Sequence, residues 1–277
     1  MAISINTNSS ALSAQRNMSQ ASQLLDNSVN RLATGIRVNS AADDAASLAI
    51  SKKFDALVRS MGQGIQNGNE AIGMVQIADG GLQGINENLG RMRELSLRAS
   101  NDTYSAEDRA IAQQEIGALM QSIDDIASRT RFGNTALLNG SAGAAGDGVV
   151  SFQIGADITS SQNVKFGDAR SSAILSSGVD VTTQTNASTS IDNIDAAIKN
   201  VSDMRSTLGA AQNQLESAVM NTTQGMLNTA SANSAMRDLD FGAESANFQK
   251  FNLLAQSGAL ALAQANQSSQ SIMSLLR

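Results

Sequence analysis

The stretch RLATGIRVNSAADDAASLAI, residues 31–50, decides the fold because it separates two long helical patterns. Gly35 interrupts the first pattern. Ser40 followed by Asp43 is typical of a helix N-cap, and the acidic pair Asp43–Asp44 suits the positive end of a helix dipole. We therefore predict that one helix ends near Gly35 and that another begins after Ser40.

The segment upstream, from about Asn8 to Ala33, is predicted to be an amphipathic helix with a narrow apolar stripe. Its apolar residues recur at spacings of three and four, as on one face of a helix. They are Ala11, Ala14, Met18, Ala21, Leu25, Val29 and Leu32. The remaining positions are mostly Ser, Asn and Gln, and a helix this polar is not stable alone. It needs a partner that covers the stripe.

The segment downstream predicts a very long helix, from about Ala41 to Ala99. At 1.5 Å per residue it would be roughly 85–90 Å long. Its stripe, from Phe54 to Met92, keeps its phase across Gly80–Gly81, so we expect the helix to continue through this pair. Ser105 is typical of a second N-cap, and the helix that follows should fold back antiparallel on the long one.

The middle of the chain loses the helical period. Residues 149–155 alternate partly like a strand, and residues 164–166 offer a pairing partner. Asp168 to Ser190 is rich in Ser, Thr, Asn and Ala with little periodicity. We predict a small β-hairpin followed by a polar surface connection.

Helical periodicity returns at about Ser190, and a last segment runs from about Glu244 to Leu276. The thin stripes at the two ends of the chain would pair with each other and leave apolar surface for other copies. The predicted fold is mainly α, a long antiparallel helical bundle or coiled coil of the N- and C-terminal segments with a small β-hairpin region in the middle. The predicted assembly seam comprises Leu25, Val29, Leu32, Phe251, Leu262, Ile272 and Leu276.

Composition excludes several kinds of active site, and although it leaves carboxylate or Ser–Lys chemistry open, no local motif indicates either. The 277 residues include no His, Cys, Pro or Trp, which removes the usual neutral-pH base, cysteine nucleophiles and ordinary zinc or copper sites. We predict no catalytic residue, no metal and no cofactor. A net charge of −6 argues against nucleic-acid binding, and no apolar run is long enough to span a membrane. The polar start of the chain predicts no cleaved secretory signal.

Several blocks of sequence resemble bacterial flagellin in the order the family has them. They are RLATGIRVNSAADDAASLAI (31–50), NLGRMREL (88–95), FQIGA (152–156), RSTLGAAQN (205–213), LAQANQ (262–267) and the final LLR (275–277). Ala42 stands where a Lys is common and Gln214 where an Arg is common. The short middle of the chain resembles a minimal flagellin without outer domains.

The resemblance implies a structural subunit that is exported by the flagellar type III apparatus and polymerises with itself into an extracellular filament for motility. Residues 1–40 with 243–277 would form an inner coiled-coil layer, and 41–167 with 190–242 a helical rod carrying the hairpin. Residues 168–189 would be a short variable surface loop, either bare or O-glycosylated. Implied partners are an export chaperone, the filament cap and hook-junction proteins. The alternative function is a hook–filament junction protein, which has related termini.

The resemblance also implies a candidate contact for the flagellin-sensing Toll-like receptor of animal hosts. The matching positions in this sequence are Arg91, Leu95 and Glu115. The alternative is that these residues serve only assembly, since Leu95 lies three residues from Met92 and extends the stripe of the long helix.

Overall fold

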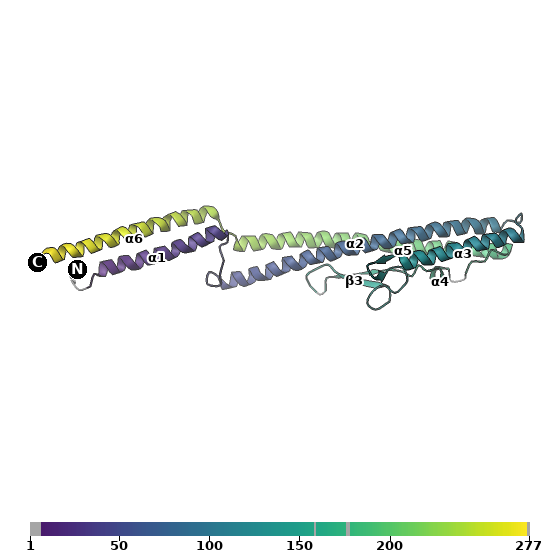
Figure 1. Cartoon of the computed structure of the whole chain (residues 1–277), viewed down its shortest axis with the longest axis horizontal. Helices are drawn as coiled ribbons and strands as arrows, with labels where there is room; N and C mark the ends of the chain where they lie inside the picture. The colour runs from purple at the N-terminus through teal and green to yellow at the C-terminus, as the bar shows by residue number, and fades with distance from the viewer. Residues whose placement is uncertain (1–6, 158, 176–177, 276–277) are drawn as a thin grey trace. The chain divides into compact units, whose positions relative to one another are not determined.

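The computed structural model describes residues 7–157, 159–175 and 178–275, and it confirms the predicted mainly α fold (Figure 1). Two compact units are distinguished: Met1–Ala56 with Asn228–Arg277, and Leu57–Leu227. The first unit is larger than the terminal layer of 1–40 and 243–277 that the resemblance implies, so that layer stays a prediction. None of the described helices is both long and apolar enough to cross a membrane.

Local capping sets where the first two helices begin and end. α1 (Ser9–Thr34) starts at Asn8, whose side chain accepts a hydrogen bond from the Ala11 N–H, and it ends at Gly35 with φ 68°. α2 (Ala45–Ala99) begins a few residues later than predicted, because Asp44 caps it by accepting from the Ala46 and Ser47 N–H groups. The helix then runs through Gly80–Gly81 without a break, as its stripe predicts.

The third helix folds back as expected. α3 (Ala106–Arg129) opens with a capping box, in which Ser105 and Asp108 each bond the other's backbone N–H. Two short antiparallel ladders follow. β1 (Arg131–Phe132) pairs with β2 (Thr135–Ala136), and β3 (Val149–Gln153) pairs with β4 (Ser161–Lys165) in the predicted hairpin.

The segment after the hairpin differs from the predicted surface connection. It contains α4 (Ser171–Ile174), and α5 (Gln184–Arg237) already begins at Gln184. Its larger buried apolar side chains are Ile174, Leu175, Val179 and Val181. The aliphatic residues of this segment are spaced among Ser and Thr, and the segment is too short for them to show a helical or strand period.

Polar side chains of α3 hold this segment in place. The Asp124 carboxylate accepts from the Ser171 N–H at 2.7 Å and from its hydroxyl at 2.8 Å. Gln113 donates to the Val179 carbonyl at 3.1 Å and accepts from the Val181 N–H at 2.8 Å, much as a neighbouring strand would. We call the described residues of this segment, 168–175 and 178–183, the clasp, because they are fixed against the core of the second unit.

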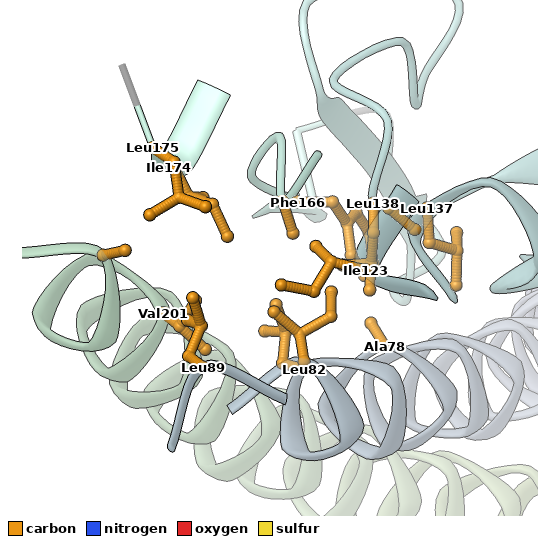
Figure 2. Close-up of a cluster of buried hydrophobic side chains, with 14 of the residues drawn as sticks. Ala78, Leu82, Leu89, Ile123, Leu137, Leu138, Phe166, Ile174, Leu175 and Val201 are labelled. Carbon is orange, nitrogen blue, oxygen red and sulfur yellow. The ribbon is translucent and has the colours of Figure 1, made fainter. Parts of the chain in front are cut away.

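The core of the second unit is one cluster built from α2, α3, α5, the clasp and the β region (Figure 2). Its largest fully buried side chains are Phe166, Leu82, Ile85, Leu89, Met92, Ile116, Ile123, Leu137, Leu138, Ile194, Leu208 and Leu215. Leucine and isoleucine dominate, as expected for a chain with few aromatic residues.

The hairpin docks on α2 through a glycine. A Cβ built on Gly64 would lie 2.0 Å from the Ile154 carbonyl oxygen, so only glycine permits this approach. One turn further along, the Asn67 side chain donates to the Gln153 carbonyl at 2.9 Å. Gly62 on the same helix has no atom within 4 Å of a built Cβ.

This difference predicts opposite effects of two alanine substitutions in one helix. Gly64→Ala should lower the stability of the monomer by about 1–3 kcal/mol, because the hairpin backbone must shift. Gly62→Ala should raise it by up to ~1 kcal/mol through helix propensity. Urea unfolding of the two variants measures both effects, and equal midpoints would contradict the docking of the hairpin on Gly64.

Candidate functional site

The terminal helices pair through complementary stripes. α6 (Phe241–Leu275) runs antiparallel beside α1, since the Asn8 side chain donates to the Ala265 carbonyl at 3.0 Å and the Ser28 hydroxyl donates to the Glu244 carboxylate at 2.5 Å (Figure 1). The inward positions of α1 are Ala11, Ala14, Met18, Ala21, Leu25, Ser28 and Leu32. Those of α6 are Glu244, Phe248, Phe251, Ala255, Gly258, Leu262, Ala265 and Ser269. Both sets repeat at three and four residues, the heptad spacing of a coiled coil.

The seam defined by these two sets is thin. Alanine, glycine and serine fill half or more of the inward positions. A Cβ built on Gly258 would lie 3.2 Å from the Met18 Cβ, so the backbones approach closely there. Among all the inward residues only Ala21, Ser28 and Glu244 are buried, while the rest are half-buried. Small side chains bury little apolar area, and the pair gains correspondingly little stability.

The structure describes five of the predicted assembly-seam side chains, and their role in assembly stays a prediction. Leu25, Leu32, Phe251 and Leu262 all lie inward. Val29 does not, since 45% of its surface is exposed and Ser28 takes the heptad position instead. A stripe defined by apolar residues alone leaves out Ser28, although Ser28 keeps the heptad spacing. The Ile272 side chain and Leu276 lie outside what the structure describes.

Large apolar side chains remain uncovered on both terminal helices. Leu12, Leu24 and Val29 are exposed on α1, and Leu253, Leu254 and Leu260 on α6. Leu260 is the extreme case, with 73% of its surface exposed. An isolated exposed leucine is ordinary, but several along a helix pair that has so small a seam indicate surface for further association.

The link between α1 and α2 is held by polar contacts. Asp43 accepts from the Ser40 N–H and hydroxyl, and these hydrogen bonds lower the pKa of its carboxyl below the ordinary value. The Ser47 hydroxyl and N–H lower the pKa of Asp44 in the same way. Both carboxylates thus serve the turn and the cap. No three acidic side chains in the described part of the chain gather as a metal site.

The three candidate receptor residues separate into two environments. Arg91 and Glu115 form an ion pair at 2.8 Å between α2 and α3, with about two-fifths of each side chain exposed, 42% and 43%. Leu95 is only 5% exposed and belongs to the core cluster. Little of the Leu95 side chain is therefore exposed for a partner in this fold, and the receptor contact itself stays a prediction.

Glu244 is the seam residue that sequence reasoning missed. It is 7% exposed although it is acidic, and its carboxylate faces Ser28. The signal was present, since Glu244 lies four residues before Phe248 in the same heptad phase. The sequence did not predict Glu244 as a seam residue, because the stripe was defined by apolar residues alone.

Comparison with protein families matches both ends of the chain. A model of the bacterial flagellin N-terminal helical region matches residues 5–143, and a model of the bacterial flagellin C-terminal helical region matches residues 191–276. The two matches together cover more than half of the chain and include α1 and α6.

Individual proteins agree with these matches. The chain is 35% identical over 284 residues to the flagellar filament 33 kDa core protein of Treponema phagedenis, and 36% identical over 275 residues to a flagellin of Halalkalibacterium halodurans. Each alignment covers 99% of both proteins. A solved structure titled as a flagellar hook-associated protein of Vibrio parahaemolyticus superposes with a TM-score of 0.55, covering 71% of this chain and 98% of that one. At 15% identity this last likeness shows the fold alone.

Proposed function

The chain belongs to the bacterial flagellin family, and from this premise we propose how its surfaces build a filament. It is a structural subunit of the extracellular flagellar filament that polymerises with itself, and it is not an enzyme. Its full-length relatives are named as filament proteins, whereas the hook-associated structure shares only the fold, so nothing favours the junction alternative.

The proposal is that the α1–α6 pair forms the inner layer of the filament, as residues 1–40 with 243–277. The observation that carries it is the thin seam together with the exposed leucines on the outer faces of the same helices. A pair that buries so little within one chain gains stability when neighbouring copies cover Leu253, Leu254 and Leu260. Residues 41–167 and 190–242 then serve as the surrounding rod, with the clasp as part of its core.

Other partners follow from the same uncovered surface. Before assembly the apolar faces of α1 and α6 are open to association with the wrong protein. An export chaperone that covers α6, and cap and hook-junction proteins that engage these faces at the two ends of the filament, fit this requirement. These three partners are proposals drawn from family membership and from the exposed leucines.

Amide hydrogen exchange tests the inner-layer proposal. In the monomer, residues 9–34 and 241–271 should exchange fast, because the small apolar burial does not offset the ordering entropy of two helices. In the filament the same residues should be protected, while the core of the second unit is protected in both. Strong protection of α1 and α6 in the monomer would contradict the proposal.

We also propose that Arg91 and Glu115 form the exposed part of a receptor contact. Arg91→Ala should then weaken activation of a Toll-like receptor reporter cell by the monomer. Arg93→Ala is the matched control, since Arg93 lies on the same helix, is 45% exposed and forms a comparable ion pair with Asp195 at 2.6 Å. Equal loss in both variants, or none in either, removes Arg91 from the contact.

A further inference from the structure

Glu244 is the one charged residue among the inward positions of the seam, and the half-buried Arg31 of α1, which pairs with Asp43, lies three residues after Ser28. Among the described residues no ion pair involves it, and its contacts are the Ser28 hydroxyl at 2.5 Å and the Asn247 side-chain amide at 3.4 Å. Its place in the first turn of α6 gives some stabilisation from the helix dipole. A carboxylate removed from water with one strong hydrogen bond still loses more solvation than these contacts return.

Ser28 is the matching feature on α1. It is 2% exposed and is the only polar residue among the seven inward positions of that helix. Its hydrogen bond to Glu244 is buried, whereas the bond from the N-cap residue Asn8 to the Ala265 carbonyl is only partly buried. If α1 separates from α6, Glu244 regains water, and so the charge favours separation.

We propose that the Ser28–Glu244 pair keeps α1 and α6 weakly paired in the free chain, so that stable pairing waits for neighbouring copies. Burying the Glu244 carboxylate costs free energy. The seam offsets little of this cost, because it consists of Ala, Gly and half-buried residues. Contact of Leu253 and Leu260 with other copies supplies the missing apolar burial. This inference rests on the proposed inner-layer function and adds the residues that make it conditional.

A single disulfide measures the pairing directly. The chain has no Cys, so Met18→Cys with Gly258→Cys introduces the only two thiols. The built Cβ at 258 lies 3.2 Å from the Met18 Cβ, slightly closer than the ~3.5–4.5 Å that a disulfide spans, so a small outward shift of the helices permits the bond. When paired states are rare, the rate of intrachain cross-linking in dilute monomer is proportional to the pairing equilibrium.

In this background, Ser28→Ala with Glu244→Leu should raise the cross-linking rate about tenfold, since replacing a buried polar pair by apolar residues stabilises by an amount of that order. Ser28→Ala alone should lower the rate, because Glu244 then loses its donor. Glu216→Gln is the control, since it removes one negative charge from an exposed position on α5. It should leave the rate unchanged.

The outcomes separate this inference from the proposed function. An unchanged or lower cross-linking rate in the double variant would overturn the inference. If the double variant aggregates, Glu244→Gln replaces it, and a smaller increase in the cross-linking rate is then expected. Protection of wild-type α1 and α6 in the monomer would contradict the inner-layer proposal instead. The direction of the change in cross-linking would still report whether Ser28–Glu244 weakens the pair.

Discussion

Leu262→Asp should abolish filament formation while leaving the second unit folded. Leu262 lies at an inward, half-buried position of α6. The neighbouring inward positions of the same helix are small, namely Ala255, Gly258 and Ala265, so Leu262 is the largest side chain among them. A carboxylate at this position would be buried without a partner, at a cost of several kcal/mol. Because its residues are small, the seam gives the α1–α6 pair little stabilising free energy, and the cost of burying the carboxylate exceeds it.

The measurement is seeded polymerisation followed by sedimentation and electron microscopy. Gln264→Asp is the matched control, because it adds the same charge two residues away at an exposed position of α6. Thermal unfolding of the monomer should be the same for both variants, since the core of Leu57–Leu227 contains neither residue. Normal filaments of Leu262→Asp would show that this face of α6 is not part of the seam.

Periodicity predicted the long elements because each carries many repeats. The stripe of α2 runs from Phe54 to Met92 in a helix of 55 residues, and the eight glycines within that helix do not disturb its phase. Capping residues predicted the start of α3 and the end of α1 for a different reason. A cap depends only on a few neighbouring residues, so the sequence shows it directly. At the start of α2 two acidic residues compete for one role, and only the backbone geometry assigns the cap to Asp44 and the turn to Asp43.

Short and tertiary features were beyond sequence reasoning. The clasp looked like a surface loop because its packing depends on Gln113 and Asp124, which lie 47 or more residues away along the chain. Leu95 matched a family position, yet its burial in the core cluster depends on tertiary packing that the sequence around it does not show. The part that Ser28 and Glu244 play in the seam is likewise visible only when α1 and α6 are side by side.

The β region should prove essential to the stability of the rod, and Phe166→Ala tests this with the largest expected effect on folding. Phe166 directly follows β4, is 1% exposed, and lies in the same cluster as Ile123 and Leu138 (Figure 2). Its N–H donates to the Gly148 carbonyl at 2.8 Å, which fixes the backbone just after β4. Removing a fully buried phenylalanine side chain costs about 3–5 kcal/mol.

Such a loss lowers the midpoint of thermal unfolding by roughly 10 °C for a unit of this size. Phe152→Ala on β3 is the matched control, because Phe152 is only partly buried against the same cluster and should lose less than half as much. Calorimetry of the monomers compares the two. If both variants unfold at the wild-type temperature, the hairpin is an appendage. If Phe166→Ala alone is strongly destabilised, the short β region and the long helices form one cooperative core, which explains how a rod of thin helices with few aromatic residues remains folded before any neighbour covers it.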